Sequence, residues 1–221
     1  MVPRPSSPRP PRLPAALAGP ESDALADGFE WVGVNSGGDF SGQRAGNCEI
    51  TESRVVGAQF IGTTLDGIRM RDTVLEACDL SGARLGDADL NRVEFRNCKM
   101  PAVDLAAARL HDVLFTDSKL DNANFRMISG RHLRFDHVSL RAADFYAAEA
   151  SHARLLDCDL TASEFSQSKL VGVHLHGSNL EGLKGAVYLR HAIIDSTQVL
   201  PLALGVFAAL DIEINDDREV D

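Results

Sequence analysis

The feature that most restricts the fold of this chain is a period of five residues through its centre. Large apolar residues occupy 26 of the 29 positions reached in steps of five from Phe40 to Leu180, and the exceptions are Ala45, Gly130 and Ala150. A helix repeats every 3.6 residues and a strand every 2, so neither keeps every fifth residue on one buried surface for so long. A coil with four flat sides does, if each unit of five residues forms one side.

Small residues occupy most positions two before each large one. This second set includes all four cysteines, Cys48, Cys78, Cys98 and Cys158. We expect them to point inward as small buried groups. Their spacings match no zinc motif, and a reducing compartment disfavours a disulfide between Cys78 and Cys98. The sequence therefore predicts no metal site, no cofactor and no catalytic residue.

Residues 20 apart should stack in successive coils, because four units of five complete a turn. This places the large aromatic residues in two columns on opposite faces. One column is Phe95, Phe115 and Phe135, and the other is Phe125, Phe145 and Phe165. We interpret both columns as a source of stability, because stacked rings bury a large apolar area.

The five-residue units resemble those of the pentapeptide-repeat family, whose loose A-(D/N)-L-x-x pattern recurs here. Examples are Ala88-Asp89-Leu90, Val103-Asp104-Leu105, Ala123-Asn124-Phe125, Ala143-Asp144-Phe145, Cys158-Asp159-Leu160 and Ser178-Asn179-Leu180. The resemblance covers roughly residues 38 to 184. It implies an all-β solenoid, a right-handed quadrilateral β-helix of about seven coils. The best-known members are thought to imitate the DNA duplex and so occupy type II topoisomerases such as DNA gyrase.

The chain divides into three predicted segments. Residues 1–28 hold seven of the nine prolines and are expected to be a disordered Pro-rich tail. A proline-rich docking peptide and a misplaced start codon are the alternatives for this tail. Residues 29–185 form the pentapeptide-repeat β-helix, and residues 186–221 form a C-terminal cap or dimerisation segment.

The C-terminal segment begins with a helix-start signature, Asp195-Ser196-Thr197-Gln198, followed by an apolar run. We expect a short helical cap here, because a solenoid needs a cover on its last coil. The run is more apolar than a simple cap requires, and resemblance to quinolone-resistance members implies a homodimer. The expected dimer interface is Val199, Leu200, Leu202, Leu204, Val206, Phe207 and Leu210. An intramolecular lid over the last coil is the alternative.

Charged residues alternate in sign along the outward columns, for example Asp72, Arg92, Asp112, His132 and His152. Such alternation avoids like-charge contacts between coils, and none of the four faces is strongly acidic. Within the DNA-mimic hypothesis, the candidate partner-binding residues are Asp89, Asp112, Asp121 and Asp159. Surface histidines are common, so we do not interpret His132 and His152 as a metal pair.

Composition narrows the possible functions further. The net charge of −10 argues against direct nucleic-acid binding, and no apolar run reaches the roughly 20 residues of a membrane span. The sequence predicts a cytoplasmic, non-enzymatic protein-interaction module, with DNA gyrase as the most concrete partner. A structural scaffold or adaptor with no topoisomerase partner is the alternative.

Overall fold

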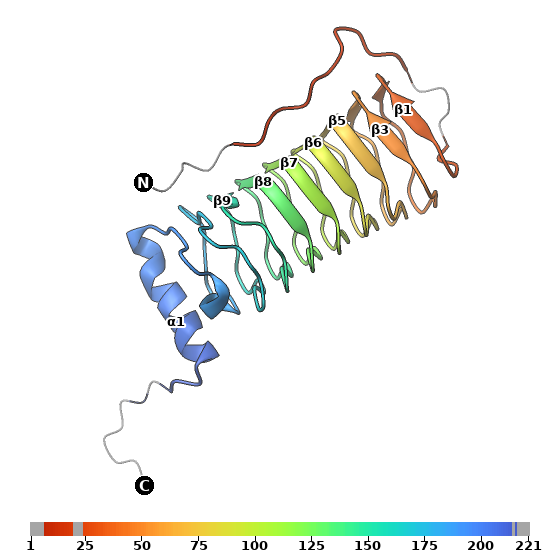
Figure 1. Ribbon diagram of the computed structural model, residues 1–221. Coiled ribbons are helices and arrows are strands. Elements are labelled where there is room, and N and C mark those ends of the chain that lie inside the picture. The colour runs from red at the N-terminus through yellow and green to blue at the C-terminus, as the bar shows by residue number, and fades with distance from the viewer. Residues whose placement is uncertain (1–6, 20–23, 214, 216–221) are drawn as a thin grey trace.

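The computed structural model describes residues 7–19, 24–213 and 215, which form a rod of stacked coils ending in a helix (Figure 1). The strands are β1 (Glu30–Val32), β2 (Asn35–Ser36), β3 (Glu49–Thr51), β4 (Arg54–Val56), β5 (Arg69–Glu76), β6 (Asp89–Arg96), β7 (Arg109–Thr116), β8 (Ser129–Asp136) and β9 (Arg154–Leu156). The 3-10 helices η1 (Ala186–Tyr188) and η2 (Ser196–Gln198) precede the helix α1 (Val199–Ala209). The predicted all-β solenoid with a short C-terminal helix is confirmed.

All the strand pairs are parallel, and each main pair joins residues 20 apart. The column from Glu49 to Lys169 contains seven residues at this interval and therefore spans six complete turns. The pairing continues through Glu164 with Lys184 and His174 with Ile193, so it extends past the expected end at residue 185. The unbroken register keeps corresponding residues of successive coils one above another.

Every coil turns at the same corners, where the backbone has a positive φ. Glycines occupy some corners, such as Gly62 (φ 62°), but Ala102 (φ 55°) and Met127 (φ 57°) adopt the same conformation. A left-handed residue other than glycine costs roughly 1–2 kcal/mol. Hydrogen bonds between coils, such as Ala102 N–H to the Asp121 carbonyl at 2.8 Å, hold these corners in place.

The interior of the rod is filled by the two predicted phenylalanine columns. Phe95, Phe115 and Phe135 stack with centroids 4.8 Å apart, and Phe125, Phe145 and Phe165 stack at 4.8 and 4.9 Å. The columns also meet edge to face, as between Phe125 and Phe135 at 5.6 Å. The stacking distance equals the usual spacing of neighbouring strands, about 4.8 Å, so the rings and the backbone ladder share one repeat.

Each end of the core has a cover. Trp31 lies against Phe40 at the first coil, with ring centroids 5.4 Å apart, and is only 5% exposed. At the last coil, Asp195 accepts a hydrogen bond from Thr197 N–H, and Gln198 Oε1 accepts one from Asp195 N–H. This capping box confirms the predicted helix start. Over the described residues, no helix is both long enough and apolar enough to cross a bilayer.

We expect Phe115→Ala to destabilise the rod strongly, because Phe115 stacks on two rings and is fully buried. Loss of a buried phenylalanine costs about 3–5 kcal/mol. The free energy of unfolding from urea denaturation measures this loss. Ile61→Ala is the matched control, since Ile61 is 41% exposed, and a similar loss in both variants would contradict the central role of the stack.

Candidate functional site

The N-terminal segment, residues 7–19, runs back along the side of the rod from the β1 end toward β9 (Figure 1). Its contacts follow in order along the coils. Ala18 pairs with Val34, Arg12 bonds to Asp72, and Arg9 bonds to Asp112. Ser7 Oγ lies 3.5 Å from a guanidinium nitrogen of Arg154. Residues 7–19 of the segment expected to be a disordered tail have specific partners on the rod, while residues 1–6 and 20–23 lie outside the described residues.

The contact at Asp112 combines burial with several donors. The Asp112 side chain has no exposed surface. Its Oδ1 accepts hydrogen bonds from the Arg9 backbone N–H at 3.1 Å and from His132 Nδ1–H at 2.8 Å. Its Oδ2 accepts one from Arg9 Nε–H at 2.8 Å. The tail thus supplies both a main-chain donor and a cation to a buried carboxylate.

Asp72, two coils earlier, repeats the arrangement. Its Oδ1 accepts hydrogen bonds from the Arg12 backbone N–H at 3.0 Å and from Arg92 Nε–H at 2.5 Å, and its Oδ2 accepts one from Arg92 Nη2 at 2.6 Å. In each case a tail N–H and a basic side chain from the next coil share one carboxylate. The predicted column from Asp72 to His132 is therefore confirmed, and the tail is the part that sequence reasoning missed.

These contacts lower the pKa of both carboxyl groups. For Asp72, the bond from Arg92 is the main cause, and the Arg12 amide adds to it against the opposing effect of burial. For Asp112, burial alone would raise the pKa, but the bonds from Arg9 and His132 outweigh it. Both groups are therefore ionised at neutral pH, which is the state that accepts these hydrogen bonds.

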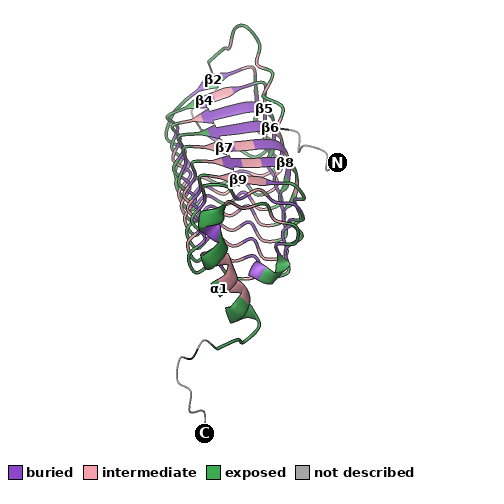
Figure 2. Cartoon of the chain, turned by 90° about the vertical axis from the view of Figure 1, so that its left-hand side faces the viewer, coloured by how far each residue is buried: buried purple, intermediate pink, exposed green. Residues whose placement is uncertain are grey.

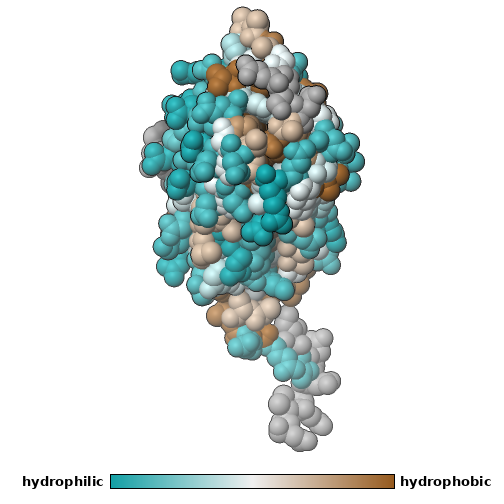
Figure 3. Space-filling view, turned by 90° about the vertical axis from the view of Figure 1, so that its right-hand side faces the viewer, coloured by the Kyte–Doolittle hydropathy of each residue, from teal (hydrophilic) through white to brown (hydrophobic). Residues whose placement is uncertain are grey.

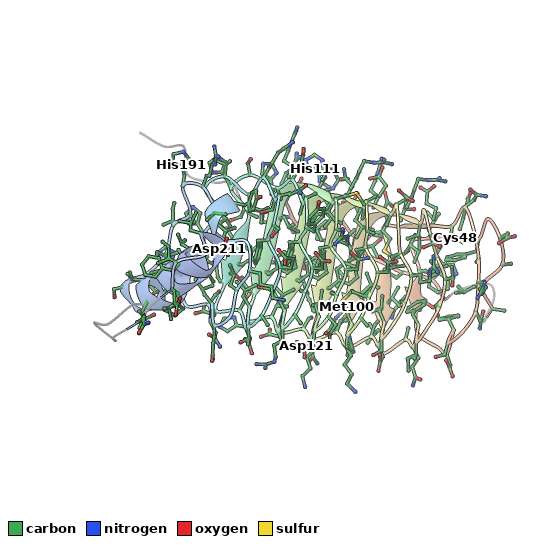
Figure 4. All side chains as sticks on the ribbon, turned by 90° about the horizontal axis from the view of Figure 1, so that it is seen from below. Cys48, Met100, His111, Asp121, His191 and Asp211 are labelled. Atoms are coloured by element: carbon green, nitrogen blue, oxygen red, sulfur yellow. The ribbon has the colours of Figure 1, made fainter. Side chains whose placement is uncertain are left out.

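The four acidic residues expected to bind a partner do not form one site. Asp121 and Asp159 lie together, because the Arg141 backbone N–H bonds to Asp121 and the Arg141 guanidinium bonds to Asp159. Asp89 lies half a turn of the coil away from Asp159, on another face, where it pairs with Arg109 at 3.4 Å. Asp112 is covered by Arg9. His111 and Asp121 accordingly lie at opposite edges of the rod in Figure 4.

His111, Asp112 and His132 form the one group, within the described ranges, whose ligand atoms have the spacing of a metal site, all within 4.8 Å of one another. His132 bonds to Asp112, whereas its predicted neighbour His152 is not in this group. Both oxygens of Asp112 already accept hydrogen bonds from Arg9 and His132. A cation at this position would therefore compete with the Arg9 guanidinium.

The residues expected at a dimer interface divide between two sides of α1. Leu202 and Val206 pack against the core, so this side of the helix covers the last coil. Val199, Leu200, Leu204, Phe207 and Leu210 remain exposed, and Leu200 is 68% exposed. A groove of about 840 Å³ runs between α1 and the last coil, lined by residues that include Leu183, Tyr188 and Leu204. Gly205 also lines the groove, and a Cβ added there would lie 3.0 Å from the Leu183 carbonyl oxygen.

We expect the tail to leave the rod in acid. A carboxylate with a lowered pKa stabilises the docked state above its ordinary pKa of about 3.9, and this contribution is lost as pH falls through the docked value. The proton shifts of the Arg9 and Arg12 amides should therefore titrate with midpoints below that value. The Ala18 amide, which bonds to the Gly33 carbonyl, is the control. Midpoints at or above the ordinary value would contradict the assignment.

Comparisons with known proteins agree with this geometry. A family model described as "Pentapeptide repeat region" matches residues 48–125 and 108–184. Full-length QnrB1, a plasmid-mediated fluoroquinolone resistance protein, is 19% identical, with a TM-score of 0.50 over 83% of this chain and 99% of its own. HetL, a pentapeptide repeat protein involved in heterocyst differentiation regulation from the cyanobacterium Nostoc sp. strain PCC 7120, is 21% identical, with a TM-score of 0.43 over 77% and 84%. No curated protein has significant sequence similarity to the chain.

The family model spans residues 48–184, which is more than half of the 221 residues. Its repeats coincide with the stacked coils from β3 to the last turn before η1. The sequence period, the coil register and the family model therefore agree, and this chain belongs to the pentapeptide-repeat family.

Proposed function

We propose that this chain is a non-enzymatic protein-interaction module that acts in the cytoplasm through the outer surface of its rod. The observation that carries the proposal is the filled interior. Phe115, Phe125 and Met100 are fully buried, and Met100 lies within the rod in Figure 4. A gap lined by Phe60, Met70 and Leu85 measures only about 10 Å³, far below the few hundred Å³ of a typical small-molecule site.

The sides of the rod offer charge and shape, and the groove of about 840 Å³ lies at its end beside α1. Hydrophilic side chains dominate the face seen from the β1 end (Figure 3). Outward residues pair along the rod, as Arg69 does with Glu49 at 3.2 Å and Lys169 with Glu149 at 2.5 Å. Exposed pairs of this kind contribute little to stability, about 0–1 kcal/mol each. Their regular spacing gives a rigid and extended surface suited to another macromolecule.

DNA gyrase is the partner we propose, on the strength of the family resemblance. In this proposal the rod imitates the DNA duplex, and Asp89, Asp112, Asp121 and Asp159 present negative charge to the enzyme. Asp89 retains 45% of its side-chain exposure and Asp159 retains 34%. Asp112 would become available only after Arg9 moved away. The neutralising arginines favour a weak contact over a tight one.

A supercoiling assay tests the gyrase proposal. We expect the natural chain to inhibit supercoiling, and Asp121→Lys together with Asp159→Lys to raise the half-inhibitory concentration. Each reversed exposed charge should cost about 1 kcal/mol, or roughly fivefold in concentration. Glu30→Lys, an exposed change at β1, is the control. Equal inhibition by all the variants would contradict the DNA-mimic mechanism. If neither the natural chain nor any variant inhibits supercoiling, gyrase is not the partner.

We propose that the chain forms a homodimer through the C-terminal segment. The support is an apolar surface that α1 leaves uncovered, with Val199 57% and Leu210 58% exposed. The groove beside Leu200 and Leu204 continues this surface. Exposed apolar patches of such density usually mark an interface. The residues that already pack on the core, Leu202 and Val206, belong to the lid and would lie behind the interface.

The dimer is tested by sedimentation equilibrium. We expect the natural chain to sediment as a dimer and Leu200→Asp with Leu204→Asp to sediment as a monomer, since charge at a desolvated contact is costly. Val32→Asp, at an exposed position of β1 near the other end, should leave the dimer intact. If the natural chain remains monomeric at high concentration, the dimer proposal is contradicted, and α1 serves only to cover the last coil of its own chain.

A structural scaffold or adaptor without a topoisomerase partner is the second candidate. The observation that favours it is the docked N-terminal segment, because the rod already holds an extended piece of polypeptide at Asp72 and Asp112. A scaffold that uses this segment would lose its partner when residues 1–28 are deleted. The same deletion would leave a gyrase contact on the Asp121 side unchanged.

A further inference from the structure

Several outward residues near the corner that holds the tail are buried. Val74 and Glu94 occupy outward positions of β5 and β6, in register with each other, yet they are 4% and 6% exposed. Asp72 and Asp112 on the same corner are 5% and 1% exposed. Strands β5 and β6 are drawn largely as buried in Figure 2. We define the binding groove as this corner, from Asp72 to Asp112.

The tail meets the groove with a period of three residues. The amides of Arg9 and Arg12 both donate to carboxylates, and Pro8 and Pro11, which precede them, are partly buried. Further along, the side chain of Pro14 lies 3.8 Å from where a Cβ on Gly33 would be. A polyproline II helix has three residues per turn and rises about 3.1 Å per residue. Residues three apart in such a segment therefore present the same side to the rod.

This rise matches the spacing of the coils. Three residues of polyproline II span about 9.3 Å, and two coils at about 4.8 Å each span about 9.6 Å. Asp72 and Asp112 lie two coils apart, because the residues just before them are in register through Arg71 with Asn91 and Asn91 with His111. Two amides three residues apart in an extended segment, those of Arg9 and Arg12, therefore meet carboxylates two coils apart. This match of spacing depends on the backbone conformation alone, so another segment in the polyproline II conformation has the same spacing of amides.

The groove also favours positive charge on its occupant. Asp72 and Asp112 lie on the tail side, and Arg9 Nε–H donates to Asp112 at 2.8 Å. The guanidinium of Arg12 acts on Asp72 through its charge. Arg92 faces Asp72 from the rod, and His111 and His132 face Asp112. The tail amides donate to the same carboxylates beside these bases.

We propose that this groove is a binding site for extended, cationic proline-rich segments of the form Arg-x-x-Arg, and that residues 7–14 are its resident, displaceable occupant. The proposal rests on the proposed function as an interaction module and deepens it by naming the class of segment bound. Arg9 and Arg12 supply the tail's hydrogen bonds to Asp72 and Asp112, and the Arg9 side chain is 61% exposed. A second segment with the same groups makes the same contacts in the tail's place.

The resident segment competes as a tethered ligand. A short flexible tether gives an effective concentration on the order of millimolar. A free peptide with a dissociation constant near 100 µM therefore binds the natural chain about tenfold more weakly than a chain whose own segment is disabled. In the natural chain, residues 7–14 therefore occupy the site and reduce its affinity for a free peptide. Substitutions that weaken the contacts of these residues with the groove should raise that affinity.

The test uses full-length chains and a fluorescent peptide with the sequence of residues 7–18, SPRPPRLPAALA. The opened variant carries Arg9→Pro and Arg12→Pro, because proline keeps the extended conformation but lacks the N–H donor and the charge. We expect fluorescence anisotropy to show about tenfold tighter binding to the opened variant than to the natural chain. Adding Asp72→Asn and Asp112→Asn to the opened variant should abolish the gain.

Two controls separate groove binding from other effects. Glu30→Gln added to the opened variant changes one charge at β1 and should leave the affinity unchanged. A peptide with proline in place of both arginines should not bind. Circular dichroism melting of each variant shows whether the rod is intact, since the tail contributes little to its core.

The outcomes decide the proposal. No peptide binding by an intact opened variant at millimolar peptide would overturn it, and so would equal binding after Asp72→Asn and Asp112→Asn. Equal binding by the natural and opened chains would overturn the resident-occupant part. The assay contains no topoisomerase, so failure of supercoiling inhibition leaves this result standing, and failure of peptide binding leaves the gyrase proposal to its own assay.

Discussion

The structure depends on a ladder of hydrogen bonds between coils of equal length. Each unit bonds to the unit 20 residues away, as Asp104 N–H does to Ala83 and Leu105 N–H to Asn124. An inserted residue would shift every later side chain relative to the coil below. The stacked phenylalanines have the same 4.8 Å repeat, so the core and the ladder reinforce each other. This shared repeat explains why left-handed corners persist even at alanine and methionine.

A filled coil leaves function to the outside. The outward columns mostly neutralise themselves, as Arg141 does for Asp159 and Arg109 for Asp89. Asp72 and Asp112 differ, because they are buried and accept bonds from a segment far away in sequence. Their unusual burial, rather than their charge, marks the groove. The surface of α1 differs for another reason, since one side of the helix covers the core and the opposite side remains apolar and exposed.

Much of the fold and part of the site could be predicted from local pattern. The five-residue period is visible in the residues themselves, and the alternation of Asp72, Arg92 and Asp112 follows once the 20-residue turn is recognised. The Asp195 capping box is equally local, because its donors lie within three residues. Proline-rich composition usually indicates disorder, so the contacts of the tail could not be expected from its residues, and their three-residue spacing becomes informative only beside the coil spacing.

The sequence by itself determined the coil, its buried columns, the inward cysteines and the helix start, because each depends on residues at a fixed separation along the chain. The tertiary structure alone decided that Arg9 meets Asp112 and Arg12 meets Asp72, across separations of 103 and 60 residues. It also decided which carboxylates are covered and which side of α1 is free. Such contacts join residues at no fixed separation along the chain, so they depend on how the completed rod presents its corner to the returning segment.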